Sequence, residues 1–219
     1  MEAVLIGHSF IRRLQHRYIG QQSNILSADT ARTFSHVLEI SEYYSKIYTI
    51  CDRFNTQKDF NKVLDELQTL TKDKGGNVNL VLLEIGSNDL AHLIRPDVNF
   101  CLKLASQITE LAIQIRKQFA KAVIVHGEVP RTKRLSSSPL VFTKNLNFYN
   151  HYLEQFLATE ERIQYVKLKG FYCADSTLVH STVPKWSFDG IHCNTPQGFQ
   201  LYKKRLRHSL IHYHRIGSQ

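Results

Sequence analysis

Five short apolar runs, rich in β-branched residues, alternate in this sequence with longer segments of helical periodicity. The runs span Glu2–Gly7, Lys46–Cys51, Val78–Ile85, Ala122–His126 and Ile163–Lys167. Short continuous apolar runs are typical of parallel strands that are covered on both faces. Parallel neighbours need a crossover connection, which is usually a helix. The alternation therefore predicts a doubly wound α/β fold with a parallel sheet.

The segments between the runs carry apolar residues at the spacing i, i+3, i+4 and i+7, which predicts amphipathic helices that pack on the sheet. They span Phe10–Ile19, Gln57–Lys72, Val98–Phe119, Thr143–Thr159 and Pro196–His212. The last of these follows Asn194 and Thr195. Either residue suits the N-cap of a helix that has proline in its first turn.

The longest connections without a predicted element are Gly20–Ser45 and Pro130–Phe142, and Leu135–Pro139 is the most loop-like stretch. Neither connection has the composition of a domain linker, and no internal repeat divides the chain. A chain of 219 residues is close to the usual size of one domain. We therefore expect residues 1–219 to form a single domain.

The composition is that of an ordinary globular protein, with 42% hydrophobic and 21% charged residues. No segment approaches the roughly 18 continuous apolar residues of a membrane span, so we expect a soluble protein. Four cysteines (Cys51, Cys101, Cys173 and Cys193) are scattered without a C-x-x-C pair, which favours reduced thiols over a disulfide framework. Because no signal peptide is recognised ahead of the first run, we expect a cytoplasmic location.

The net charge is +9 and the isoelectric point is near 9.4, which favours contact with polyanions or anionic lipid surfaces. The basic residues concentrate on the first helix, in one loop and on the last helix: Arg12, Arg13, Arg17, Arg131, Lys133, Arg134, Lys203, Lys204, Arg205, Arg207 and Arg215. Solvated helix faces and a polyanion-binding surface are equally good interpretations of this pattern.

Polar motifs follow four of the predicted strands. They are Gly7-His8-Ser9, Gly86-Ser87-Asn88-Asp89, Gly127-Glu128-Val129-Pro130 and, after a loop, Asp189-Gly190-Ile191-His192. In an open parallel sheet, ligands bind at the carboxyl ends of the strands. We therefore expect these four segments, far apart in sequence, to meet at one edge of the sheet.

The residues at this edge fit nucleophilic catalysis. Ser9 lies where an apolar strand gives way to a helix, and a serine hydroxyl becomes a nucleophile when an imidazole takes its proton. His192 is the candidate base, and Asp189, three residues earlier, can hold that imidazole in the required tautomer. Ordinary roles are also open: Ser9 or Asn88 could cap a helix, and His192 could be a surface side chain.

The three blocks around Ser9, Asn88 and His192 resemble the SGNH (GDSL-type) hydrolase superfamily. Gly-His-Ser stands where that family has Gly-Asp-Ser, Gly-Ser-Asn-Asp matches Gly-x-Asn-Asp, and Asp-Gly-Ile-His matches Asp-x-x-His. The resemblance spans almost the whole chain. It implies a three-layer α/β/α fold of flavodoxin-like type and ester hydrolysis through an acyl-serine.

Catalysis of this kind also needs donors for the oxyanion of the tetrahedral intermediate. Asn88 can offer its side-chain amide, and the Ser9 backbone N–H lies at a helix N-terminus, where the dipole helps. The resemblance implies a third donor, a glycine N–H after the second strand. This chain has no glycine in Asp52-Arg53-Phe54-Asn55-Thr56, and it has His8 where the family has aspartate.

Gly86, Trp186 and Phe188 are candidate substrate-binding residues. The two aromatic side chains flank the Asp-x-x-His block, where they could line a pocket for the substrate or anchor the loop on the core. His208 and His212 have the i, i+4 spacing of a metal pair, but no carboxylate or cysteine pattern accompanies them. No nucleotide- or metal-binding motif is found, so we expect no cofactor and no metal.

A narrower resemblance lies in Asp-Gly-Ile-His, followed by Gly198-Phe199, Tyr202 and a basic run. It is similar to the esterase domains in the first open reading frame of some animal LINE-type retrotransposons. The leading hypothesis is a serine esterase or acetyl-ester hydrolase acting on a small, lipid or acetylated ester. The alternative is a weakly active or inactive module that binds RNA or an anionic membrane as part of a mobile-element protein, with affinity that falls steeply with salt.

Overall fold

The computed structural model describes residues 1–7, 9–20, 27–51, 56–72, 78–127, 138–167 and 195–217. Its centre is a parallel sheet of β1 (Glu2–Gly7), β2 (Lys46–Cys51), β3 (Val78–Glu84), β4 (Ala120–His126) and β5 (Ile163–Val166). The strands lie in the order β2-β1-β3-β4-β5, which is the flavodoxin-like order. The predicted fold class is confirmed, and each predicted strand is present with ends shifted by at most two residues.

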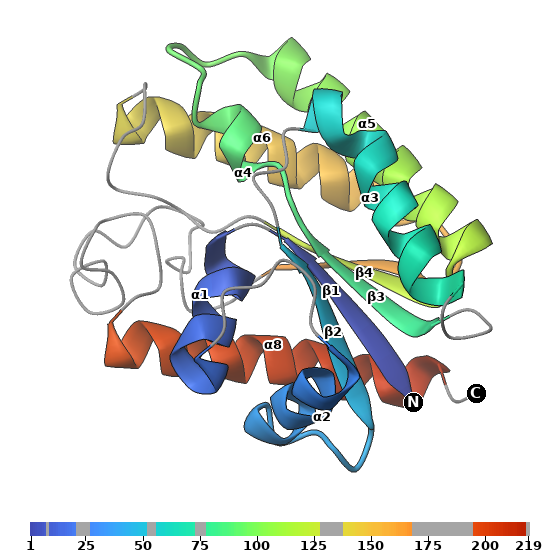
Figure 1. Ribbon diagram of the computed structural model, residues 1–219. Coiled ribbons are helices and arrows are strands. Elements are labelled where there is room, and N and C mark those ends of the chain that lie inside the picture. Colours follow the sequence, from blue (N-terminus) through green and yellow to red (C-terminus); the bar gives the residue numbers. More distant parts are fainter. Residues whose placement is uncertain are drawn as a thin grey trace.

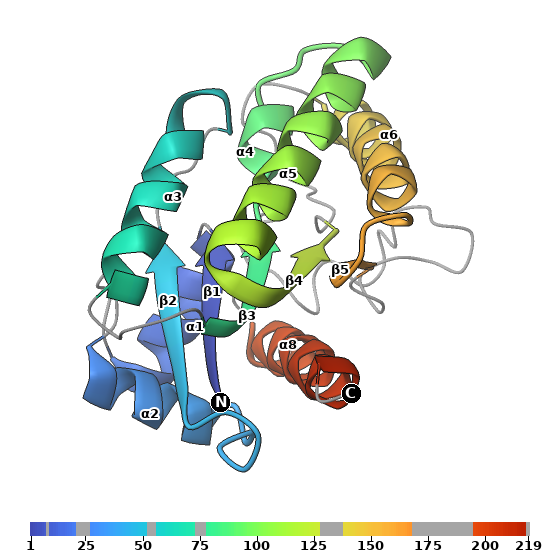
Figure 2. The same cartoon turned by 90° about the vertical axis from the view of Figure 1, so that its right-hand side faces the viewer.

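Helices cover both faces of this sheet (Figures 1 and 2). One face carries α1 (Ser9–Ile19), α2 (Ala28–Val37) and α8 (Pro196–Gly217), and the other carries α3 (Thr56–Lys72), α4 (Ser87–Leu90), α5 (Val98–Gln118) and α6 (Pro139–Leu157). The predicted helices are all present. The arrangement has the three layers α/β/α.

Two connections that we expected to lack structure contain helical residues. The segment Gly20–Ser45 includes α2, and α6 begins at Pro139, inside the expected loop Pro130–Phe142. Both helices begin at a serine N-cap: the side chain of Ser27 accepts a hydrogen bond from the Thr30 N–H, and that of Ser138 from the Val141 N–H. These caps satisfy amide groups that a helix N-terminus otherwise leaves unpaired.

The core consists of the strands and the inner sides of the helices. In β1, every residue from Ala3 to Gly7 is buried, and α5 buries a stripe that includes Leu104, Ile108, Leu111 and Ile115. Cys51 and Cys101 are buried free thiols, as expected for a reduced protein. Burial raises the pKa of both thiols to about 12, so neither is a nucleophile near neutral pH. Cys173 and Cys193 lie outside the described residues.

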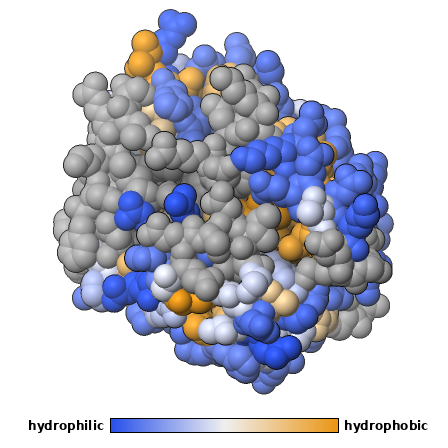
Figure 3. Space-filling model, viewed as in Figure 1, coloured by the Kyte–Doolittle hydropathy of each residue, from blue (hydrophilic) through white to orange (hydrophobic). Residues whose placement is uncertain are grey.

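Within the described ranges, no helix combines the length and the apolar character needed to cross a bilayer. On the face shown in Figure 3, the described surface is mostly hydrophilic, with hydrophobic residues in small separate patches. Large exposed hydrophobic side chains, such as Ile94 and Leu140, occur singly in the sequence, as is usual on protein surfaces.

Candidate active site

The carboxyl ends of β1, β2 and β3 lie side by side, and the strand register brings the first two predicted motifs together. Gly7 pairs with Cys51 on one side and with Glu84 on the other. Ser9 is the first residue of α1, directly after β1, and Ser87 opens α4, directly after β3. The backbones of the Gly7–Ser9 and Gly86–Asp89 motifs therefore leave neighbouring strands at the same edge of the sheet. The Ser9 side chain is outside the described part.

Close packing explains the glycine of the first motif. A Cβ atom on Gly7 would come within 2.7 Å of the Ile11 Cδ1 atom and 3.1 Å of the Glu84 carbonyl oxygen. The Ile11 side chain can rotate away, so the close approach of the Glu84 backbone is the contact that favours glycine at this position. Ser9 is the first residue of α1, so its backbone lies at a helix N-terminus.

Backbone conformation explains the glycine of the second motif. Gly86 is the N-cap of α4 with φ of +120°, and a Cβ atom there would lie 2.8 Å from the Tyr149 Oη. Tyr149 is fully buried and donates a hydrogen bond to the Ile85 carbonyl at 3.0 Å, so its ring is held against the turn. Asn88 is half-buried in α4, whereas Asp89 is buried.

Four predicted site residues lie outside the described residues: Asp189, His192, Trp186 and Phe188. The same is true of His8 and of the segment 52–55, so the role of a glycine-free backbone after β2 stays a prediction. The structure therefore brings together the segments of Ser9, Gly86 and Asn88, and it leaves the Asp-x-x-His block untested.

The described chain resumes at Thr195, which caps α8. Its hydroxyl oxygen accepts a hydrogen bond from the Gly198 N–H at 2.9 Å, and Pro196 occupies the first helical position. The predicted helix start, with Thr195 as one of two candidate caps, is confirmed. Thr195 is 2% exposed, whereas Pro196 and Gln197 are exposed, so the cap of α8 is buried while the outer side of its first turn faces the surface.

The first turns of α8 pack on α1. The Arg17 guanidinium carbon lies 5.0 Å from the centre of the Phe199 ring, in a cation–π contact. One turn further along α8, the Tyr202 ring centre is 5.9 Å from that of Phe10. Phe10 follows Ser9 in the sequence. The helix that comes after the Asp-x-x-His block is thus in contact with the helix that begins at Ser9.

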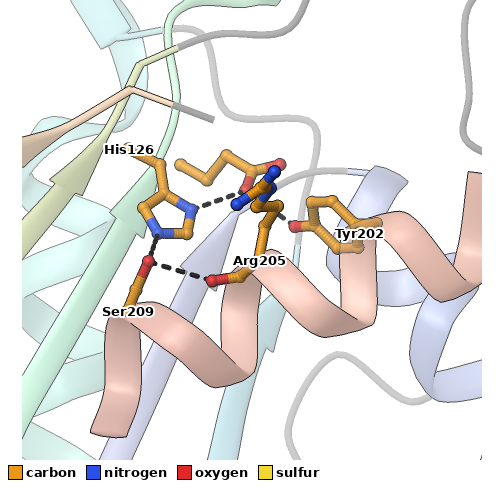
Figure 4. Close-up of polar contacts among 5 residues, drawn as sticks. His126, Tyr202, Arg205 and Ser209 are labelled. Atoms are coloured by element: carbon orange, nitrogen blue, oxygen red, sulfur yellow. Dashed lines mark hydrogen bonds and ion pairs between the residues drawn. The ribbon is translucent and has the colours of Figure 1, made fainter. Parts of the chain in front are cut away.

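Beneath α8 lies a buried polar network that the sequence interpretation missed (Figure 4). The Tyr202 hydroxyl donates to Glu84 Oε2 at 2.7 Å, and the same oxygen is 3.3 Å from His126 Nδ1. On the other side of the ring, His126 Nε2 is 2.9 Å from Ser209 Oγ, which donates to the Arg205 carbonyl at 3.1 Å. Glu84 is 1% exposed, and His126 is fully buried.

A signal for this network was present in the sequence. Glu84 and His126 are titratable side chains within the apolar runs of β3 and β4, at the last position of each strand. Buried charged or imidazole groups are rare unless they are paired, so each implied a partner. The partners on α8 could not be named, because they are 83 and 118 positions away in the sequence.

The basic residues of α8 do not form one free cationic face. Lys203 Nζ is 2.7 Å from Glu39 Oε1, and Arg207 Nη1 is 3.8 Å from Glu39 Oε2. The hydrogen bond from Lys203, and then its charge, lower the pKa of the Glu39 carboxyl. Lys204, between them in sequence, is exposed. The predicted run of cations is thus divided between ion-paired and solvent-facing positions.

His208 and His212 stack on the outer part of α8 with their ring centres 6.3 Å apart. Among the described residues, no group of three or more His, Cys, Asp or Glu side chains is arranged to hold a metal ion.

Comparisons with known proteins agree with this architecture. A family model described as GDSL-like lipase/acylhydrolase matches residues 11–198, a span that begins just after Ser9 and includes Asn88, Asp189 and His192. No curated protein matches the sequence.

Two solved structures are similar in fold. A candidate platelet activating factor from Streptococcus pneumonia has a TM-score of 0.62 at 14% identity, covering 95% of this chain and 83% of its own. A candidate SGNH hydrolase from Slackia heliotrinireducens has a TM-score of 0.53 at 14% identity, covering 96% and 98%. At these identities the likeness establishes the fold alone. The family match, which spans most of the chain, establishes more: the protein belongs to the GDSL-like lipase/acylhydrolase family, the SGNH hydrolases that its motifs predict.

Proposed function

We propose that this protein is a serine ester hydrolase in which Ser9 is the nucleophile, His192 the general base and Asp189 the residue that orients the base. The observation that carries the proposal is the pairing of β1 with β3, because it sets the Ser9 and Asn88 segments next to each other at the carboxyl edge of the sheet. Membership of a hydrolase family supplies the reaction class.

Packing at the start of α8 supports the inclusion of His192. Thr195 follows His192 by three positions, a stretch that spans at most about 11 Å when extended. The next two turns contact α1 through Phe199 and Tyr202. A base on this loop would therefore precede a helix that packs against the helix beginning at Ser9.

In the proposed reaction, Ser9 Oγ attacks the acyl carbonyl carbon while His192 Nε2 takes the hydroxyl proton. The resulting tetrahedral intermediate collapses when His192 returns that proton to the leaving alcohol, which leaves an acyl-serine. A water molecule, deprotonated by His192, then attacks the acyl carbon and releases the carboxylic acid. The proton returns to Ser9, so the enzyme is regenerated.

The first turn of α1 favours a negative charge on the reacting oxygen. Its residues Ser9, Phe10 and Ile11 include no carboxylate, and Arg12 follows them. The partial positive charge of the helix N-terminus is therefore not opposed by an acidic side chain. With the Ser9 N–H and the Asn88 amide as donors, this is the electrostatic setting that an oxyanion needs.

The test is ester hydrolysis by Ser9→Ala beside a matched control, Ser27→Ala. Ser27 is a serine N-cap on α2, so the control removes a capping hydroxyl at a second helix start. We expect Ser9→Ala to abolish turnover of p-nitrophenyl acetate and labelling by a fluorophosphonate, while Ser27→Ala keeps both. Equal activity of folded Ser9→Ala and wild type would refute the proposal, and equal losses in the two variants would reduce Ser9 to a helix cap.

Acyl chain length belongs to the same proposal and is read from a series of p-nitrophenyl esters. A small or acetylated ester is the expected substrate class, with lipid esters as the longer members of the series. A sharp fall in kcat/KM beyond acetate would support an acetyl-ester hydrolase, and a rise with chain length would support a lipid substrate.

Contact with RNA or an anionic membrane is a separate proposal, as is a place in a mobile-element protein. Arg13, Arg17 and Lys204 are exposed basic side chains on α1 and α8, and the net charge is +9. Replacing Arg13 and Lys204 by alanine should weaken binding to RNA or anionic vesicles and flatten its dependence on salt. Ester turnover should not change. Salt-independent binding would argue against an electrostatic surface.

A further inference from the structure

The buried network under α8 joins three elements that surround the candidate site. Glu84 ends β3, His126 ends β4, and Tyr202 and Ser209 lie two turns apart on α8. Figure 4 shows Tyr202 and Ser209 on the side of α8 that faces His126. All four side chains are at least 97% buried. Each hydrogen bond in this group therefore acts away from water, where its geometry is firmly held.

Glu84 Oε2 lies at the centre of these contacts. It accepts a hydrogen bond from the Tyr202 hydroxyl at 2.7 Å and lies 3.3 Å from His126 Nδ1. The other ring nitrogen of His126 is 2.9 Å from Ser209 Oγ, which is also 3.1 Å from the Arg205 carbonyl oxygen. His126 thus bridges Glu84 on β3 and Ser209 on α8, with one ring nitrogen toward each.

The same three residue types, Ser209, His126 and Glu84, have the connectivity of a catalytic triad, and Ser209 lines a cavity of about 340 Å³ between β5 and α8. Two observations argue against a second nucleophile. Ser209 is 3% exposed, and its hydroxyl donates a hydrogen bond to the Arg205 carbonyl. Because Ser209 lies within a continuous helix, its own N–H cannot serve an oxyanion. The network is therefore not a reaction centre.

Its position gives it another role. Glu84 lies two residues before Gly86, at the start of the segment that carries Asn88, and Tyr202 is in the second turn of α8, the helix that follows His192. A hydrogen bond of 2.7 Å between Glu84 and Tyr202 thus joins the two segments directly. Any sliding or rotation of α8 would break it.

We propose that Glu84 is a positioning residue: through Tyr202 and His126 it fixes α8 against β3 and β4 and so sets the distance between the Asn88 segment and the base His192. The inference rests on the proposed function, because it assigns Glu84 a role in that reaction without contact with substrate. A displacement of a catalytic group by about 1 Å can cost on the order of 100-fold in rate.

The test compares Tyr202→Phe with Tyr44→Phe. Both tyrosines are 1% exposed, and both hydroxyls hydrogen-bond across the interface with α8. Tyr44, however, donates to the carbonyl of Leu210, about 12 Å further along the helix from Tyr202. Each variant loses one buried hydroxyl. If the Tyr202 hydroxyl had a purely structural role, the two variants would lose stability and activity to the same extent.

We expect the two variants to lower Tm by similar amounts, while only Tyr202→Phe lowers kcat for p-nitrophenyl acetate, by about tenfold, with KM within twofold of wild type. Such a split marks an interaction that acts on the transition state and not on substrate binding. Glu84→Gln, which keeps the side-chain shape, should show the same split. Equal kcat in Tyr202→Phe and Tyr44→Phe would overturn the inference.

A second measurement does not depend on turnover. Hydrogen exchange of the peptide that spans His192 and the first turn of α8 should be faster in Tyr202→Phe than in Tyr44→Phe. Equal exchange would overturn the inference even if the wild type proved inactive, whereas turnover that does not need Ser9 would refute only the proposed function. Fluorophosphonate labelling of Ser209 in wild type would also overturn it, since it would show a reactive second serine.

Discussion

Gly86→Ala is the substitution whose cost can be worked out most fully from the structure. Gly86 has φ of +120°, outside the regions that residues with a side chain adopt. Holding a non-glycine residue in such a sparsely populated region costs about 1–3 kcal/mol. The new Cβ would also lie 2.8 Å from the Tyr149 Oη and 3.0 Å from its Cζ. Tyr149 is fully buried and hydrogen-bonded, so it cannot move away cheaply.

Overpacking of this kind in a well-packed core costs about 1–3 kcal/mol. Together with the backbone strain, we expect Gly86→Ala to destabilise the protein by about 2–6 kcal/mol. For a protein of this size each kcal/mol lowers Tm by about 2–4 °C. The matched control is Gly20→Ala, where φ is +76° but no atom of the described residues lies within 4 Å of the new Cβ. It should cost only the backbone term, about 1–2 kcal/mol.

Urea unfolding of both variants, with and without Tyr149→Phe, separates the two terms. Removing the Tyr149 hydroxyl should reduce the cost of Gly86→Ala by about 1 kcal/mol or more, in the manner of a double-mutant cycle, and should leave the cost of Gly20→Ala unchanged. The reasoning is refuted if Gly86→Ala costs no more than Gly20→Ala, or if the two changes at Gly86 and Tyr149 are simply additive.

The remaining predictions concern the cap of α8 and the buried thiols. Thr195→Ala should lower the free energy of unfolding in urea by about 1 kcal/mol, while Thr195→Ser stays close to wild type; equal stability of all three proteins would argue against the cap. Cys51 and Cys101, each with a pKa near 12, should resist iodoacetamide at pH 8 until the protein unfolds, as followed by peptide mass spectrometry. Because these folded pKa values lie above the unfolded value of about 8.5, the thiols contribute their full stability below pH 8.5 and lose it as the pH rises toward 12. A urea midpoint that increases over this range would contradict the assignment.

The sheet was predictable because its sequence signal is local. Each strand of this sheet is a short apolar run, and a buried parallel strand needs little else. The limits of that signal show at β3, where the run continues to Ile85 while the strand ends at Glu84. Hydrophobicity alone does not mark this end. The backbone turns at Gly86, whose positive φ ends the ladder.

The helix α2 was not predictable by the same means. Its sequence has threonine, serine and histidine at many positions, and only Ala31, Phe34 and Ser35 are buried. Three buried positions give too short a stripe for the periodicity to stand out. Ser27 ahead of it was the available clue, as was Ser138-Pro139 ahead of α6, because serine caps and proline in the first turn mark helix starts.

The candidate site also has one part that the sequence predicts and one part that it does not. The motifs around Ser9 and Asn88 follow neighbouring strands, so the topology alone brings their backbones together. The contacts of Glu84 are different, because its partners His126 and Tyr202 are 42 and 118 residues away. Such pairs depend on how α8 lies on the sheet. No local pattern in the sequence specifies that angle.

The polar network also explains how α8 reaches a single position on the sheet. Leu206 and Leu210 bury α8 in the core, but apolar contacts are not directional and tolerate small shifts along a helix axis. Hydrogen bonds are directional, and Tyr202 and Ser209 are two turns apart, so their bonds to Glu84 and His126 fix both the rotation and the axial position of α8. Because these bonds set the position of α8, the contribution of Glu84 and Tyr202 to function should be sought in the rate of ester hydrolysis, beside the loss of Tm that any lost buried hydrogen bond brings.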